Sequence, residues 1–283
     1  MLTLYASRLR LDLDIPWRRT RAALRAAFAP CWRPLLPPTE RVEIAVDERL
    51  QVRCDGAAVT EAAGPGDLLP VVEHLLYQVI LAHCRPALAL HAAALVAPAG
   101  APLLLLGASG AGKSTLARAL VRAGWSYLGD DLAFFDGTRL WGLPRTIQFN
   151  PIALDETPAP LLAGCDLSSC LYHAADGRTV ALPLAPVAEE RVARGPAPAA
   201  AARLILLTSP DATVHAPTAE GAVLETCAPL AALAALHEAT LAPLANWPAE
   251  LGALIHPARC HRLAWRDPAH AAALLSGLDP AAP

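Results

Sequence analysis

The sequence has almost no lysine. Of its 23 Lys and Arg residues, Lys113 is a lysine and all the others are arginines. This bias indicates that arginine has replaced lysine wherever either cation serves. The compact ammonium of Lys113 is therefore expected to have a task that a planar guanidinium cannot perform.

Charge of either sign is also scarce, and this excludes several classes of protein. Only 17% of the 283 residues are charged, 54% are hydrophobic, and the net charge is -3. Such a composition excludes a disordered chain. It gives no reason to expect a nucleic-acid or membrane partner. The length favours two structural units, or one large domain with an appendage.

The sequence also lacks a cysteine framework, a membrane span and a secretory signal. Its 7 cysteines have no repeating spacing, which is typical of reduced thiols rather than of disulfides or a metal site. The longest apolar stretch, residues 79–98, is interrupted by polar residues and proline, so no transmembrane helix is predicted. The charged N-terminus does not fit a secretory signal. We therefore expect a cytoplasmic protein.

The pattern of apolar residues predicts a small unit in front of a larger domain. Residues 1–86 are expected to form an α+β unit that binds substrate or a partner, and residues 87–283 an α/β domain in which strands and helices alternate. Strands are expected at 2–14, 41–46, 50–54, 88–96, 103–106, 125–128, 132–135, 140–143, 179–182 and 203–207, helices at 22–28, 68–84, 112–123, 230–242 and 248–254, a strand–helix pair at 261–273, and an irregular loop at 191–202.

A complete phosphate-binding motif fills the G-x-x-x-x-G-K-[ST] pattern between an apolar strand and a helix. Its glycines let backbone N–H groups point at phosphate oxygens, and the helix N-terminus adds partial positive charge. Lys113 is expected to contact the β- and γ-phosphates of ATP, and Ser114 to bind Mg²⁺. Thr115 is expected to pack on or cap the helix. The loop residues are Gly107, Ala108, Ser109, Gly110, Ala111, Gly112, Lys113, Ser114 and Thr115.

Two adjacent carboxylates, Asp130 and Asp131, follow the loop after one helix and one return strand. Neighbours on an extended segment point to opposite sides, so their roles must be divided. One can bind Mg²⁺, and the other can take a proton from an incoming hydroxyl. His91 lies among small apolar residues in the strand before the loop strand. It is either a histidine of the core or a third member of the site.

These three features resemble the kinase domain of HPr kinase/phosphorylase. In that family a His-Gly strand precedes the loop, and an Arg-Gly-His-x-Leu-x-x-Asp-Asp stretch follows its helix. The corresponding segments here are LHAA at 90–93 and RAGWSYLGDD at 122–131. The resemblance covers roughly residues 88–150 and implies an α/β P-loop kinase core of the HPr kinase type, with a mixed sheet and flanking helices, preceded by the small α+β unit. It also implies that Asp131 activates a substrate serine, Asp130 assists the metal, and His91 orients groups near the γ-phosphate.

The sequence departs from the family at two places. Thr115 stands where the family has Glu, and nothing downstream matches its Glu-[Ile/Val]-Arg-Gly-Leu-Gly-Ile signature, which is linked to HPr handling and to phosphorolysis. The remainder is similar to divergent kinases of this superfamily encoded beside ribosomal-peptide pathways, including those of lasso peptides. The resemblance implies ATP and Mg²⁺ as cofactors, and as partner a precursor peptide or small protein that presents a serine. A homo-oligomer stays open.

Two other functions fit the same loop. A small-molecule kinase of the shikimate or gluconate type also places Asp soon after the loop helix, although such kinases are shorter and lack the His strand. A non-enzymatic module, in which ATP orders a partner surface, would need no base. Arg145 is expected either to clamp a phosphoryl group or to lie at the surface. Arg191 and Arg194 are candidates for a lid over the nucleotide.

Overall fold

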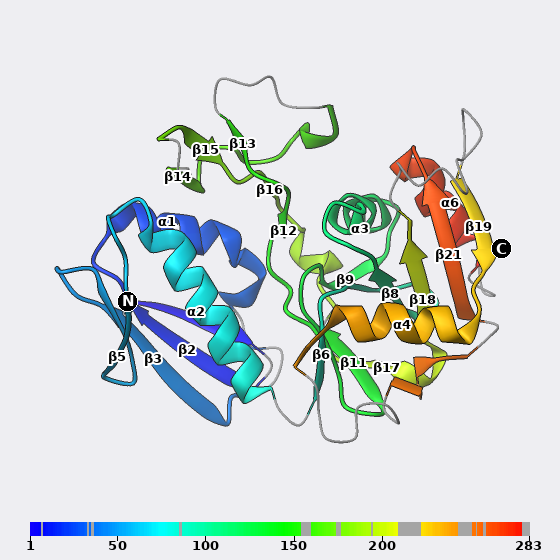
Figure 1. The fold of residues 1–283 in the computed structure, drawn as a ribbon, viewed down its shortest axis with the longest axis horizontal. Helices are drawn as coiled ribbons and strands as arrows, with labels where there is room; N and C mark the ends of the chain where they lie inside the picture. Colours follow the sequence, from blue (N-terminus) through cyan, green and yellow to red (C-terminus); the bar gives the residue numbers. More distant parts are fainter. Residues whose placement is uncertain are drawn as a thin grey trace. The chain divides into compact units, whose positions relative to one another are not determined.

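Contacts between Cα atoms divide the computed structural model into two units. Unit 1 comprises Met1–Cys84 and Arg145–Pro186, and unit 2 comprises Arg85–Pro144 and Val187–Pro283 (Figure 1). The expected boundary at residue 86 lies close to the first division, but residues 145–186 belong to unit 1 rather than to the larger domain. The structure describes all residues except 7, 33, 35–36, 85–86, 154–159, 174–176, 194, 209–221, 243–250, 253, 257–258 and 279–283.

Unit 1 is built on a five-stranded sheet of order β1-β2-β3-β4-β5. Where one strand was expected over 2–14, an antiparallel pair forms, with Ala6 opposite Leu9. The apolar positions are even before this turn and odd after it, so one continuous strand would have placed them on opposite faces. The hairpin expected at 41–54 is confirmed. The strands are β1 (Leu2–Ala6), β2 (Leu9–Asp14), β3 (Glu40–Val46), β4 (Gln51–Cys54) and β5 (Ala57–Glu61).

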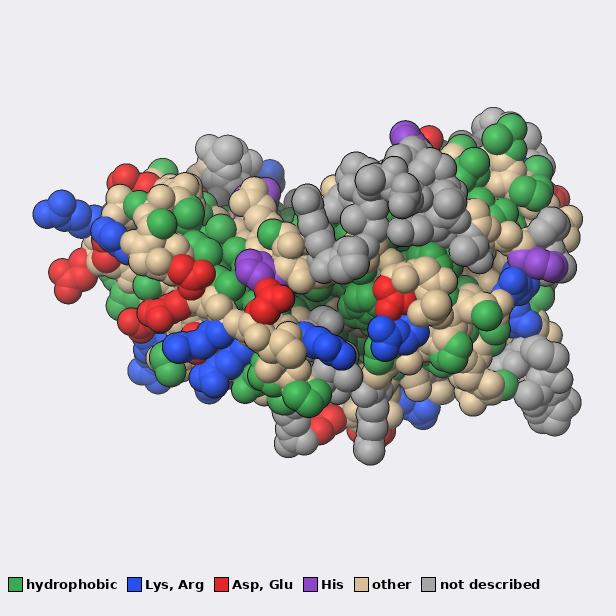
Figure 2. Space-filling model, turned by 90° about the horizontal axis from the view of Figure 1, so that it is seen from below, with side chains coloured by type: hydrophobic (Ala, Val, Ile, Leu, Met, Phe, Trp, Pro, Cys, Tyr) green, Lys and Arg blue, Asp and Glu red, His purple; other side chains and the backbone are tan. Residues whose placement is uncertain are grey.

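Two helices accompany this sheet, α1 (Arg18–Ala27) and α2 (Leu68–His83), with the short η1 (Ala29–Trp32) after the first. The predicted second helix is confirmed, and Leu68, Val72, Leu76 and Ile80 form its buried stripe at a spacing of one turn. The first helix starts earlier than expected, so the Arg18–Arg21 cluster forms its first turn. On the face of unit 1 drawn in Figure 2, acidic and basic side chains are interspersed.

Residues 145–186 join unit 1 through hydrogen bonds to α1. Thr146 donates its N–H to the carbonyl of Ala27, 2.9 Å away, and its hydroxyl to that of Ala26, 2.6 Å away. The thiol of Cys170 donates to the carbonyl of Ala23. The sequence carries no local sign of these long-range contacts. The segment holds β12 (Ile147–Gln148), β13 (Ile152–Ala153), η2 (Pro160–Leu162), β14 (Leu171–His173), β15 (Thr179–Ala181) and β16 (Leu184–Ala185).

Unit 2 contains a six-stranded sheet of order β19-β21-β18-β8-β7-β9. The strands β8, β18 and β21 are parallel, and β7 runs antiparallel to both β8 and β9. The carboxyl ends of β8, β9, β18 and β21 therefore meet the start of β7 at one edge. The strands are β7 (Ala93–Val96), β8 (Pro102–Leu106), β9 (Ser126–Gly129), β18 (Arg203–Leu207), β19 (Ala222–Thr226) and β21 (Cys260–Trp265).

Both faces of this sheet are covered, which explains its continuous apolar strands. Leu103 and Leu105 of β8 pack with α3 (Lys113–Arg122) and α6 (Pro268–Ser276). Leu104 and Leu106 pack on the other face with α4 (Pro229–Ala239) and a second sheet, of order β17-β11-β10-β6-β20. The expected mixed α/β architecture is confirmed. The second sheet has β6 (Leu88–Leu90), β10 (Ala133–Phe135), β11 (Arg139–Gly142), β17 (Ala197–Pro198) and β20 (Thr240–Ala242); η3 (Glu189–Arg191) and η4 (Ala199–Ala201) flank β17.

The strand expected at 88–96 is two strands in two sheets. The chain leaves β6 at His91, whose N–H donates to the carbonyl of Ala239 at 2.7 Å, and enters β7 at Ala93. An apolar run gives no sign of this change, because both halves are buried. The helix expected at 230–242 ends at Ala239, and the one expected at 248–254 lies largely outside the described residues.

The cysteines and the length of the apolar helices bear on two further expectations from the sequence. The 7 cysteines are thiols rather than half-cystines, and burial raises the pKa of Cys31, Cys84 and Cys170 to about 12. Among the described residues, no helix is both long enough and apolar enough to span a membrane.

Candidate functional site

The phosphate-binding motif forms a loop between the end of β8 and the start of α3. Gly107, Gly110 and Gly112 have φ angles of 154°, 80° and 91°, a region that other residues rarely enter. A Cβ placed on Gly110 would meet nothing within 4 Å, so the space beside this part of the loop is open. Three glycines with positive φ, one of them beside open space, followed by a helix N-terminus, fit a cradle for phosphate oxygens.

The last glycine of the motif is also constrained by a residue far away in the sequence. A Cβ on Gly112 would overlap Cζ2 of Trp265, the final residue of β21, and would lie 3.1 Å from its Cη2. The indole edge thus rests against the residue that caps α3. Sequence reasoning missed Trp265. The available signal was an aromatic residue at the carboxyl end of a predicted strand.

Gly112→Ala is expected to lower the free energy of unfolding by about 3 kcal/mol, because strain at positive φ adds to the clash with Trp265. Gly110→Ala is the matched control. It has a similar φ and no neighbour to displace, so a loss of about 1 kcal/mol is expected. Urea denaturation of both variants measures the difference. Equal losses would show that the ring does not constrain the loop.

Lys113 is held inside the loop. Its side chain is only 7% exposed, and its Nζ donates to the carbonyl oxygens of Gly107 at 2.8 Å and Ala108 at 3.2 Å. Burial lowers the pKa of Lys113, and the nearby charge of Asp130 opposes this shift in part. A compact ammonium fits between these two carbonyls, whereas the planar guanidinium of an arginine does not. That the single lysine contacts the β- and γ-phosphates stays a prediction.

The two adjacent aspartates, Asp130 and Asp131, have different surroundings. Asp130 is fully buried, and its Oδ1 accepts a hydrogen bond from the hydroxyl of Tyr127 at 3.0 Å. The negative charge of Asp130 raises the pKa of Lys113, so this carboxylate lies near the lysine of the loop. Asp131 has an exposed fraction of 32%, and its Oδ1 lies 3.8 Å from Nε2 of His91. One carboxylate is thus buried near the lysine, and the other is accessible beside a histidine.

A tight packing contact fixes where these aspartates emerge. A Cβ on Gly129, the last residue of β9, would lie 2.8 Å from the carbonyl oxygen of Leu143. The N–H of Leu143 in turn donates to the carbonyl of Leu132 at 3.1 Å. Only glycine lets these backbones approach so closely. The chain therefore turns at Asp130 and Asp131, directly after the strand.

Arg145 does not lie at the surface, which is one of the two positions expected from the sequence. It is 4% exposed, and its partners are in unit 1. Its Nη1 donates to Oε1 of Glu73 at 3.1 Å, and its guanidinium lies over the ring of Tyr77. A buried ion pair with a stacked ring is a structural arrangement.

The structure predicts that Arg145→Met destabilises unit 1, because it leaves the partly buried Glu73 carboxylate, with 19% exposure, without its cation. The expected loss in free energy of unfolding is about 3 kcal/mol. Arg139→Met is the control. It breaks an exposed pair with Asp136, which is worth at most about 1 kcal/mol. Chemical denaturation compares the two variants. A loss no larger than that of the control would show that the Glu73 pair does not stabilise the unit.

The structure places Arg191, one of the two candidate lid residues, away from the phosphate-binding loop. Nη1 of Arg191 donates to the carbonyl of Gly124 at 2.8 Å, just beyond the carboxyl end of α3. The phosphate-binding loop is at the opposite end of that helix, so Arg191 does not cover it. Arg194 lies outside the described residues. The expected irregular loop at 191–202 begins at the last residue of η3 and contains β17 and η4.

The residues present fit a magnesium ion held together with phosphates. The described residues contain no cluster of three or more His, Cys, Asp or Glu that would hold a metal by themselves. Ser114, in the first turn of α3, and Asp130 offer a hydroxyl and a carboxylate. Such oxygen donors suit Mg²⁺, which usually takes few protein ligands and completes its shell with water and phosphate.

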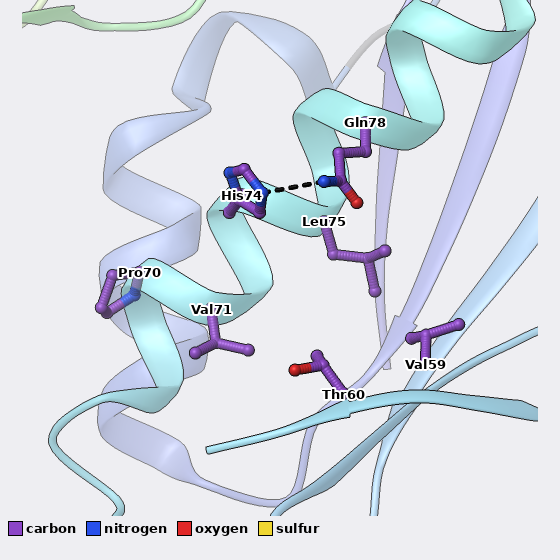
Figure 3. Close-up of a pocket in the computed structure, with 7 residues that line it drawn as sticks. All are labelled: Val59, Thr60, Pro70, Val71, His74, Leu75 and Gln78. Carbon is purple, nitrogen blue, oxygen red and sulfur yellow. Dashed lines mark hydrogen bonds between the residues drawn. The ribbon is translucent and has the colours of Figure 1, made fainter. Parts of the chain in front are cut away.

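A groove in unit 1 lies between β5 and α2 and has a volume of about 480 Å³. In Figure 3 the side chains of His74 and Gln78 lie side by side on the helix, with nitrogen atoms 2.8 Å apart. No carboxylate, Lys or Arg occurs among the lining residues, so the lining assigns no class of ligand. These residues are Val59, Thr60, Pro70, Val71, His74, Leu75 and Gln78.

Comparison with known proteins adds a distant structural likeness. Neither a family model nor a curated protein matches the chain. Among solved structures, it is similar to the HPr(Ser) kinase/phosphatase from Coxiella burnetii. The identity is 14%, the match covers 67% of this chain and 92% of that chain, and the TM-score is 0.28. A likeness at this level does not establish a shared activity.

Proposed function

We propose that this protein is an ATP-dependent phosphotransferase whose acceptor is a hydroxyl group, with a serine of a precursor peptide or small protein as the substrate. The observation that carries this proposal is the set of functional groups at one end of the six-stranded sheet of unit 2. A complete phosphate-binding loop follows β8, an aspartate pair follows β9, and His91 precedes β7 at the same edge. Phosphoryl transfer needs these parts: a cradle, charge neutralisation and a base.

The loop and its lysine bind the triphosphate in this proposal. Backbone N–H groups of the loop and the N-terminus of α3 contact the phosphate oxygens. Nζ of Lys113 exchanges its bonds with the loop carbonyls for bonds with the β- and γ-phosphates. Ser114 and Asp130 would hold Mg²⁺, and the ion would supply positive charge against the phosphates.

Asp131 serves as the base. Its carboxylate takes the proton of the acceptor hydroxyl while the hydroxyl oxygen forms a bond to the γ-phosphorus. The bond from that phosphorus to the β,γ-bridging oxygen breaks, and ADP leaves with the electron pair. The products are a phosphate monoester, ADP and a proton carried by Asp131. His91 is a positioning residue, because its imidazole lies beside the Asp131 carboxylate.

The peptide acceptor is supported by the sequence resemblance to the kinases of lasso-peptide pathways. Two alternatives differ in a measurable way. A small-molecule kinase would transfer phosphate to a polyol or a sugar acid. A nucleotide-gated module would bind ATP without transferring phosphate at all.

The test is a transfer assay with γ-labelled ATP and Mg²⁺. The acceptors are serine-containing peptides, the same peptides with Ser→Ala, and a panel of polyols and sugar acids. We expect label on serine and none on the alanine peptides. Label on a small molecule alone would replace the peptide with a metabolite, and ATP binding without any transfer would favour the gated module.

A further inference from the structure

We propose that Trp265 forms one wall of the subsite for the nucleobase of ATP. This inference rests on the proposed function and extends it from the phosphates to the base. It starts from the order of strands at the sheet edge where the phosphate-binding loop lies.

The strand order fixes the direction of the bound nucleotide. The aspartates follow β9, which lies on one side of the loop strand β8, with β7 between them. The strands β18 and β21 lie on the other side of β8. The γ-phosphate must face the base Asp131, and the nucleoside is at the opposite end of a linear triphosphate. The nucleoside therefore extends from the loop towards the carboxyl ends of β18 and β21.

Trp265 is the aromatic side chain at that place among the described residues. It ends β21, and its indole edge reaches the loop at Gly112. Its partly buried ring packs against the core formed by α3 and α6, so its position is fixed by the fold. The neighbouring Thr208, after β18, donates its hydroxyl to the carbonyl of Leu263 at 3.3 Å. A fixed and partly exposed aromatic ring is a surface on which a nucleobase stacks.

A purely structural role makes a different prediction. If Trp265 only supports Gly112, its removal distorts the loop and weakens every ligand that binds through phosphates. If it contacts the base, its removal weakens nucleotides alone. ATP and inorganic tripolyphosphate separate these roles, because both offer three phosphates and only ATP carries a base.

The experiment is isothermal titration of wild type, Trp265→Ala and Trp265→Phe with Mg²⁺ and either ATP or tripolyphosphate. For Trp265→Ala we expect Kd for ATP to rise about tenfold, and Kd for tripolyphosphate to stay unchanged. Trp265→Phe should retain most of the ATP affinity because it keeps a ring. Equal weakening of both ligands, or no weakening of either, would overturn the inference.

Tryptophan fluorescence gives a second readout, which does not need the Trp265→Ala variant. ATP should quench the emission of the wild type, and the Trp265→Phe protein should lose that part of the quenching. Tripolyphosphate should not produce it. Identical quenching by ATP in both proteins would contradict the base subsite. Failure of the proposed function looks different: either the wild type binds neither ATP nor tripolyphosphate, or it binds ATP and transfers no label in the assay with γ-labelled ATP.

Discussion

Asp131→Asn is expected to reduce phosphoryl transfer about 1,000-fold while leaving the affinity for ATP unchanged. The amide keeps the size of the carboxylate but cannot accept the proton of the acceptor hydroxyl. Because the Asp131 side chain lies beside His91 and is partly exposed, the exchange should not disturb the core. Initial rates with labelled ATP, together with calorimetric titration of ATP, measure both quantities on one preparation.

Asp14→Asn is the matched control, because Asp14 is exposed at the end of β2 and takes no part in the site. It should leave both the rate and the affinity unchanged. Full transfer by Asp131→Asn would remove this residue as the base. Loss of ATP binding in the same variant would instead place Asp131 among the groups that hold the nucleotide or its metal.

The second large effect is expected for Lys113→Arg. The ammonium sits between two loop carbonyls in a space with 7% exposure, and a guanidinium is too broad for that position. Both ATP affinity and transfer should fall, with kcat/KM lowered about 100-fold through loss of a preorganised charge at the phosphates. Steady-state kinetics and titration of ATP measure these changes.

Arg122→Lys provides the reverse exchange in the last turn of the same helix. It should change neither quantity, because either cation serves there. Thermal unfolding of both variants shows that the fold is retained. An unchanged kcat/KM in Lys113→Arg would mean that the single lysine of the sequence has no task specific to an ammonium.

Local sequence patterns predict an element correctly where the residues that determine it lie within one segment. The loop, its flanking strand and helix, and the aspartate pair all stand within residues 102–131, and the structure arranges them as that order predicts. The turn between β1 and β2 was also encoded, because the apolar positions change parity between Leu4 and Leu9. The prediction of a single strand over 2–14 is wrong because it does not take this change of parity into account.

Other features depend on contacts between distant residues. The apolar run at 88–96 is buried in both halves, so its pattern cannot show that Leu90 and Ala93 belong to different sheets. The sequence around Arg145 predicts either a phosphoryl clamp or a surface position, whereas the side chain is buried and pairs with Glu73. Trp265 meets Gly112 only through the folded sheet, and no motif links the two positions.

The most direct test of the proposed site is a crystal structure with Mg²⁺ and a non-hydrolysable ATP analogue. The phosphates are expected on the loop, with the β- and γ-phosphates on Nζ of Lys113 and the γ-phosphate facing Asp131. The base is expected on the side of Trp265. A γ-phosphate turned towards the ends of β18 and β21, or a nucleotide bound away from the loop, would contradict the proposed phosphotransferase.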